Sequence, residues 1–148
     1  MKEMLNINLK PLCSVDAELA DPIVLPNTPS GTRRILEVLS LRLAGERLVA
    51  TLKGRAAADW LTLSPDGRIG TLDVRCTLET GDGAIIFMQY AGRVRIANSS
   101  QGTHHLYVAP RFDTGDERYT WLNSIQAVGK AVQPSGSKYL RYAFHEVE

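Results

Sequence analysis

The segment Leu72-Asp73-Val74-Arg75-Cys76-Thr77-Leu78-Glu79 alternates strictly between apolar and polar side chains. Successive side chains of an extended chain point to opposite faces, so one face of this segment is apolar and the other is polar. Such alternation is typical of a strand with one buried face and one face in water. The segment therefore predicts a sheet with a core on one side.

Similar alternation recurs along the 148-residue chain, whereas helical spacing with capping residues is hard to find. Only residues 15–20 suggest a helical turn, and residues 21–31, with three prolines, are expected to form an ordered loop across one end of the sheet. The eight or nine expected strands span residues 5–12, 32–43, 47–53, 57–63, 68–79, 84–96, 103–112, 119–128 and 138–147.

Turn-forming residues separate these segments, at positions 44–46, 65–67, 81–83 and 134–137. Consecutive strands are therefore expected to pair as antiparallel hairpins within a single domain, residues 1–148. A meander of about eight strands protects its edges most simply by closing. We predict an all-β fold, a closed or nearly closed antiparallel β-barrel, with a β-sandwich as the alternative.

Composition excludes several classes of protein. The net charge of +1 and the lack of a basic stripe argue against binding to nucleic acid. No apolar run is long enough to cross a bilayer, and no signal peptide is recognisable, so we expect a cytoplasmic protein without membrane contact. Cys13 and Cys76 are expected to be reduced and structural.

The segment 84–96 is apolar on both faces, with Ile86 and Met88 on one side and Ile85 and Phe87 on the other. A strand of this kind has its outer face covered as well. We therefore expect a homo-oligomer; the alternative is that residues 21–30 of the same chain cover this face.

An ordered set of short motifs resembles the small bacterial and fungal barrels of domain-of-unknown-function family three-two-three-seven. The family pattern runs G-x-R, A-D-W, D-G, D-x-R-x-x-L, D-D-G, P-x-F-x-T-G and Y-x-W-L-N. The chain follows it at residues 31–33, 58–60, 66–67, 73–78, 110–115 and 119–123, and departs from it at Gly81-Asp82 and at Ala56-Ala57, where the family has a glycine pair. The second departure is expected to reshape the cavity mouth near Asp59.

The resemblance implies a barrel of the kind found in allene oxide cyclase and dirigent proteins. Such barrels bind apolar or aromatic small molecules and sometimes cyclise or isomerise them, and some work without a metal or redox cofactor. An isomerase, cyclase or lyase without a cofactor is therefore the enzyme class that the resemblance favours.

Three positions are candidates for catalysis. Asp59 stands beside Trp60, and a carboxyl group removed from water by an indole gains a pKa suited to general acid or base work. Its alternative role is to accept backbone hydrogen bonds at a turn. Asp73 and Arg75 share one strand face; in the lumen, Arg75 would stabilise a developing negative charge, and outside they would form an ordinary surface pair.

A second group of residues is predicted to bind substrate. Tyr119, Trp121 and Asn123 share a predicted strand face and would form an orienting wall for an aromatic ligand, or else a packed layer. Further candidates for the pocket are Trp60, Tyr90, Tyr107 and, because it falls on the family motif, Arg33. His104 and His105 are adjacent and point to opposite faces of a strand, so we predict no metal site.

Three functions are compatible with this pattern. The first is an enzyme acting on an apolar or aromatic oxygenated small molecule inside the barrel, with Asp59 as acid or base and Arg75, held by Asp73, near the developing charge. The second is a barrel that binds a hydrophobic ligand without changing it. The third is a structural oligomer with a filled interior.

Overall fold

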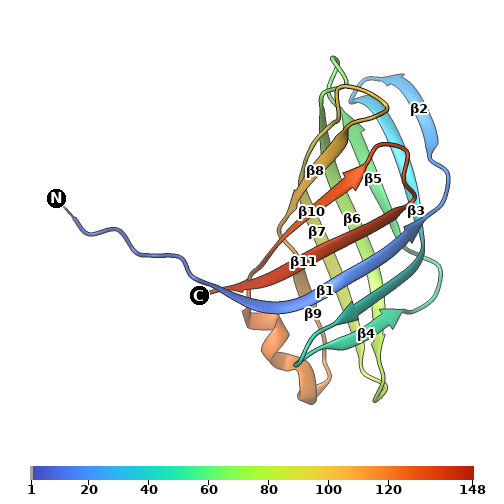
Figure 1. Ribbon diagram of the computed structural model, residues 1–148. Helices are drawn as coiled ribbons and strands as arrows, with labels where there is room; N and C mark the ends of the chain where they lie inside the picture. Colours follow the sequence, from blue (N-terminus) through green and yellow to red (C-terminus); the bar gives the residue numbers. More distant parts are fainter. Residues whose placement is uncertain (1) are drawn as a thin grey trace.

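The computed structural model describes residues 2–148 and contains strands joined by short turns (Figure 1). The elements are β1 (Leu9–Leu19), β2 (Ile23–Thr28), β3 (Gly31–Ala44), β4 (Val49–Leu52), β5 (Ala58–Leu63), β6 (Ile69–Thr80), β7 (Ile85–Arg95), β8 (Thr103–Val108), β9 (Arg111–Asp113), the 3-10 helix η1 (Glu117–Ser124), β10 (Ala127–Pro134) and β11 (Tyr139–Val147).

The strands form a closed antiparallel ring. Around the ring, β1 pairs with β3, β3 with β5 and β4, both of these with β6, and β6 with β7. The ring continues from β7 through β8, β10 and β11 back to β1. Since β4 and β5 share one position and β8 and β9 another, the barrel has eight strand positions, as the sequence predicts.

One face of each strand points into the barrel. On β6 the inward side chains are the apolar ones of the alternating segment, Leu72, Val74, Cys76 and Leu78, and all four are buried. The β6–β7 ladder is the longest, running without interruption from Ile69↔Arg95 to Glu79↔Ile85. The interior of the barrel is therefore the hydrophobic core.

One end of the barrel is closed by η1, which lies beside β9 at the bottom of Figure 1. Leu122 of this helix is fully buried, together with Phe112, Phe144 and Met88. Large side chains therefore fill this half of the interior, and the remaining space lies at the opposite end.

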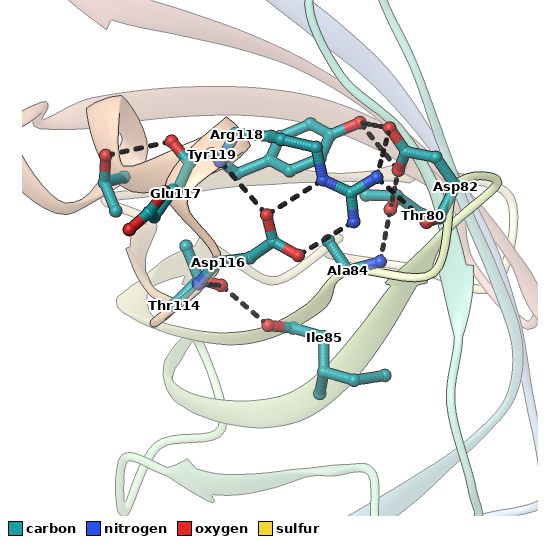
Figure 2. Close-up of polar contacts among 10 residues, drawn as sticks. Thr80, Asp82, Ala84, Ile85, Thr114, Asp116, Glu117, Arg118 and Tyr119 are labelled. Carbon is teal, nitrogen blue, oxygen red and sulfur yellow. Dashed lines mark hydrogen bonds and ion pairs between the residues drawn. The ribbon is translucent and has the colours of Figure 1, made fainter.

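Polar contacts fasten the closed end (Figure 2). Arg118 contacts the Asp116 carboxylate at 2.8 Å and the Asp82 carboxylate at 3.3 Å. The Tyr119 hydroxyl donates to Asp82 at 3.0 Å. The β6–β7 turn, where Gly83 takes a φ of 89°, is thereby tied to the helix.

Two segments differ from the predicted strands. Of the strand predicted at residues 119–128, only 127 and 128 are in a strand, because the Asp116 side chain accepts from the Arg118 N–H and starts η1 instead. Residues 127–134 form β10, although only 127 and 128 lie in a predicted strand; its first inward positions, Ala127, Gly129 and Ala131, carry small residues. At Gly129 a Cβ atom would lie 2.6 Å from the Phe144 ring, so this position has no room for a larger side chain.

The N-terminal part of the chain also differs. Residues 15–19 continue β1, and the predicted helical turn at 15–20 does not form. The proline-containing segment 21–31 includes β2, which pairs only with β3 and is therefore an edge strand, where proline is tolerated. Cys13 and Cys76 are buried free thiols, as predicted.

The outer face of β7 remains partly open to solvent. Ile85 is 46% and Phe87 37% exposed, and β2 lies on β3 rather than over them. The alternative in which residues 21–30 cover this face is therefore wrong, and self-association stays a prediction.

We expect Leu122→Ala to lower the free energy of unfolding by about 2–5 kcal/mol, because it opens a cavity in the filled half of the barrel. Urea denaturation followed by circular dichroism measures this. Thr120→Ala, an exposed change in the same helix, is the matched control. Equal stability of the two variants would contradict the role given to η1.

Candidate functional site

The open half of the barrel contains a cavity of about 250 Å³. This is slightly smaller than most small-molecule sites, which measure about 300–1,000 Å³. Its walls are largely aliphatic, with side chains such as Leu36, Leu61, Leu72 and Leu106. The β10–β11 turn and the segment between β1 and β2 form its rim, so the cavity suits a molecule of one or two rings.

Packed aromatic rings form the floor of this cavity. Tyr90 of β7 lies edge-on to Tyr142 and Phe144 of β11, with ring centroids 5.8 and 6.0 Å apart. Tyr142 and Phe144 are 5.6 Å apart. Both tyrosines line the cavity and Phe144 does not, so the layer separates the hollow half from the filled half.

Asp59 is the one buried carboxyl group found within residues 2–148, and it lines the cavity. Its side chain is on the inward face of β5, and its Oδ1 accepts the backbone N–H of Asp73 at 3.0 Å. The β5–β6 ladder is interrupted at this point, since its paired positions stop at Asp59↔Val74 and resume at Thr62↔Thr71. The Asp59 carboxyl group thus accepts the Asp73 N–H where the β5–β6 ladder provides no backbone acceptor.

The surroundings of Asp59 favour its neutral form. Burial raises the pKa of Asp59 to about 7, and the nearby Asp73 charge adds to this, whereas the Asp73 N–H partly offsets it. The Asp59 charge in turn adds to burial in raising the pKa of Tyr90 and of Tyr142. A carboxyl group with a pKa near neutrality both donates and accepts protons at physiological pH.

Tyr142 supplies an unused polar group. Its side chain is 1% exposed, and its hydroxyl forms no hydrogen bond of ordinary geometry among the described residues, although the Tyr90 hydroxyl is close enough to affect its pKa. A buried hydroxyl without a partner is costly, so such groups call for an explanation. A ligand oxygen in the cavity would satisfy it.

Polar groups also gather near the rim. Arg34 of β3, His104 of β8 and Gln133 of β10 all line the cavity. Lys138 pairs with Asp21 across the rim at 2.8 Å. The cavity is therefore apolar along its walls and polar at both ends.

Two of the predicted catalytic residues lie outside this cavity. Asp73 and Arg75 are on the outer face of β6, 50% and 58% exposed, with Arg75 Nε 3.5 Å from the Asp73 carboxylate. The prediction that they act in the lumen is wrong, because the apolar residues of the same strand occupy the inward positions. They form the surface pair that was the alternative.

The predicted aromatic wall is also elsewhere. Tyr119, Trp121 and Asn123 lie in or beside the closing helix, and their partners are structural. Asn123 accepts the Thr114 N–H at 2.8 Å and donates to the Thr114 carbonyl at 2.9 Å. The Arg47 guanidinium stacks over Trp121 at 4.7 Å. These residues hold the closed end together.

Three further candidates point away from the cavity. Trp60 comes directly after the inward-facing Asp59, and Arg33 directly before the inward-facing Arg34. Neighbouring side chains of a strand point to opposite faces, so neither Trp60 nor Arg33 lines the cavity. Tyr107 is on the outer face of β8 beside Arg95, whose guanidinium lies 5.3 Å from its ring. Of the predicted residues, Asp59 and Tyr90 are therefore the two that the structure brings together.

The sequence analysis missed Tyr142, Arg34 and His104 as cavity residues. Strand alternation was sufficient to find Arg34, since it is spaced by two from the inward Leu36. Tyr142 and His104 are likewise spaced by two from inward residues, Leu140 and Leu106. Nothing in the sequence, however, distinguishes an inward position that lines a cavity from one that is packed.

No cluster of three or more His, Cys, Asp or Glu side chains that could hold a metal ion occurs in the described part of the chain. No helix within residues 2–148 is long and apolar enough to cross a membrane.

The fold and the cavity together define a small antiparallel β-barrel with a ligand-sized, mainly apolar interior that contains one carboxyl group. The chain belongs to the family described as "Protein of unknown function (DUF3237)", whose profile matches residues 7–147. A UPF0311 protein of Bradyrhizobium diazoefficiens is 26% identical over 131 residues, which cover 78% of this chain and 82% of the relative.

A hydroalkoxylation enzyme of Penicillium herquei is 30% identical over 102 residues, covering 68% of this chain and 58% of that enzyme. Among solved structures, a β-barrel-like protein of Acinetobacter baumannii superposes with a TM-score of 0.86 at 25% identity, over the full length of both chains. A solved enzyme from Penicillium herquei gives a TM-score of 0.76 at 23% identity and covers 100% of this chain and 99% of its own, which shows a common fold.

Asp59 should make stability fall as pH rises. Between about pH 4 and 7 the folded protein retains the Asp59 proton that the unfolded chain has lost. The free energy of unfolding therefore falls over this range, by on the order of 4 kcal/mol in total. Asp59→Asn removes this dependence. We expect the unfolding free energy of Asp59→Asn relative to wild type to increase from pH 4 to pH 8, measured by urea denaturation.

Asp73→Asn is the matched control, since it removes a half-exposed carboxyl group next to the same ladder gap. Its difference from wild type should change much less over the same range. A parallel response of the two variants would contradict the desolvated state of Asp59.

Tyr142→Phe should leave the free protein as stable as wild type or more stable by about 1 kcal/mol, because the hydroxyl it removes has no partner. Tyr119→Phe removes a hydroxyl bonded to Asp82 and should lower stability by about 1 kcal/mol. Thermal and chemical denaturation compare the two. A loss at Tyr142 equal to that at Tyr119 would mean that its hydroxyl is satisfied in solution.

Proposed function

We propose that this protein is a cofactor-independent enzyme of the isomerase, cyclase or lyase type, acting on an apolar or aromatic oxygenated small molecule in the barrel cavity. The observation that carries the proposal is the position of Asp59, a carboxyl group with a pKa of about 7, above a floor of two tyrosines in an otherwise apolar cavity.

The reaction that this arrangement suits best is the addition of a hydroxyl group across an activated double bond within one molecule. The neutral Asp59 carboxyl gives its proton to one alkene carbon, and the substrate hydroxyl oxygen bonds to the other. The π bond and the O–H bond break, a C–H and a C–O bond form, and the hydroxyl proton returns to Asp59. Nothing is oxidised or reduced, so the step balances without a further reactant.

The similarity to a protein named as a hydroalkoxylation enzyme supports this reaction class. The cavity supports it independently. Its aliphatic walls exclude water, which would compete with the substrate hydroxyl for the carbon that becomes positive. Tyr142 and Tyr90 offer hydroxyl groups that orient the substrate oxygen close to Asp59.

A barrel that binds the same kind of molecule without changing it is the second candidate. The unpartnered Tyr142 hydroxyl and the apolar walls would serve a binding protein equally well. The two functions differ in what happens to a bound molecule during long incubation: recovery of the unaltered compound favours the binding protein.

We expect the protein to convert an ortho-alkenyl phenol, such as 2-(3-methylbut-2-enyl)phenol, into its cyclic ether, and to incorporate one deuterium on carbon in D2O. Asp59→Asn should lower turnover by about a hundredfold or more with little change in binding. Because the protonated carboxyl group is the active form, turnover should decline as pH rises through about 7. Liquid chromatography with mass spectrometry measures the amount of cyclic ether formed and its deuterium content.

Asp73→Asn is again the control: its carboxylate faces outward and is only a minor cause of the raised pKa of Asp59, so turnover should equal that of wild type at about pH 5, where Asp59 is protonated in both proteins. Unchanged turnover in Asp59→Asn would remove Asp59 from the mechanism. Binding of the phenol without any product in the wild-type protein would favour the binding function instead.

A further inference from the structure

Arg34 is placed in the cavity by the pleat of β3. The inward positions of this strand are spaced by two, and Arg34 precedes Leu36 and Val38 in that series. The Arg33 side chain therefore points to the other face. Arg34 is only partly exposed, and no ion pair or side-chain hydrogen bond within residues 2–148 involves its guanidinium.

Of the lysine and arginine side chains that line the cavity, Arg34 is the one without an acidic partner among the described residues. Six other basic residues form ion pairs, and the rim lysine, Lys138, is already bound to Asp21 at 2.8 Å. The carboxylate of Asp21 is thus occupied, and no contact joins Arg34 to Asp59, the other acidic residue of the cavity lining. A partly buried guanidinium with five free N–H donors is a ready site for an anion.

His104 adds a second donor beside it. The His104 Nδ1 accepts the backbone N–H of Ala97 at 2.9 Å, so the ring proton belongs on Nε2. Burial and the Arg34 charge lower the pKa of His104, which keeps the ring neutral near pH 7. Both residues therefore offer donors to the cavity mouth.

We infer that the molecule bound in this cavity carries a carboxylate at the end that faces the mouth, where the Arg34 guanidinium and the His104 Nε2–H bind it. The inference rests on the proposed function, which places a small molecule in the cavity. It narrows the substrate to an aromatic or alicyclic acid whose reacting group lies near Asp59 and whose carboxylate lies near Arg34.

The two ends of the cavity make this orientation the favoured one. The walls beside Asp59 are aliphatic and no cation of the cavity lining contacts this residue, so a carboxylate buried there would have no positive partner. The mouth has the opposite character, with one unpaired positive charge and a neutral donor. An acid therefore enters with its apolar part first.

Calorimetric titration with 2-naphthoate and 2-naphthamide tests the inference, since the two probes have the same rings and differ in charge. At pH 6, where most of Asp59 is protonated, we expect the wild-type protein to bind 2-naphthoate at least about tenfold more tightly. Arg34→Gln should reduce this preference to about twofold or less. Arg33→Gln, one residue away on the opposite face, is the matched control and should retain it.

Arg34→Lys keeps the charge and loses the planar pair of donors, so an intermediate preference is expected. It also provides a second test should Arg34→Gln fold poorly, which circular dichroism shows. A preference for 2-naphthoate that survives in both Arg34 variants, or no preference in the wild type, overturns the inference.

Leu61→Trp fills the cavity and separates this inference from the proposed function. If it abolishes binding of both probes while the wild type binds them equally, the carboxylate specificity is wrong and the cavity remains the binding site. If neither probe binds the wild type, or if both still bind Leu61→Trp, the cavity does not take such molecules and both proposals fail.

Discussion

The edge-to-face packing of Tyr90, Tyr142 and Phe144 divides the interior of the barrel, and the rest of the site depends on this division. A barrel with eight strand positions has an interior just wide enough for its own side chains or one small ligand. The three rings pack against one another inside the barrel, and Phe144 requires a residue as small as Gly129 on the adjacent strand. Below them the core is solid and supports the closing helix. Above them the strands enclose a cavity lined mainly by aliphatic side chains.

The same division explains why a carboxyl group is tolerated in the core. Asp59 occupies a place where the β5–β6 ladder is interrupted, so its oxygen replaces a backbone acceptor that the gap removes. This single hydrogen bond does not compensate for complete removal of the charge from water, and the pKa therefore rises. A valine there would pack at no such cost but would leave the Asp73 N–H without a partner. Two destabilising features, the buried Asp59 carboxyl group and the unpartnered Tyr142 hydroxyl, therefore line the same cavity. Such features are typical of functional sites.

Strand alternation was enough to predict most of the barrel, because the inward face of a small barrel is almost entirely apolar. In the segment 72–79 the alternation correctly predicts which face is buried. The same alternation places Arg75 on the outer face, so the prediction of Arg75 in the lumen is inconsistent with it. The prediction failed for η1 because Tyr119 and Trp121 are spaced by two, like strand residues, while the cap at Asp116 decides the local structure. It failed for β10 because Ala127, Gly129 and Ala131 give no apolar signal until their large neighbours on β11 are known.

The motifs that relate this chain to its family fall into two groups once they are placed in the structure. Asp82, Gly83, Thr114, Tyr119 and Asn123 fasten the closed end, and Asp66 and Gly67 form a turn. Asp59 is the one polar side chain of these motifs that points into the cavity. Arg34 and His104 lie outside the quoted motifs, although they line the same space. The closed end and Asp59 are thus built from the motifs, whereas the mouth is built from residues outside them. If the proposed function holds, the residues at the mouth, rather than Asp59, are the ones that would set substrate choice.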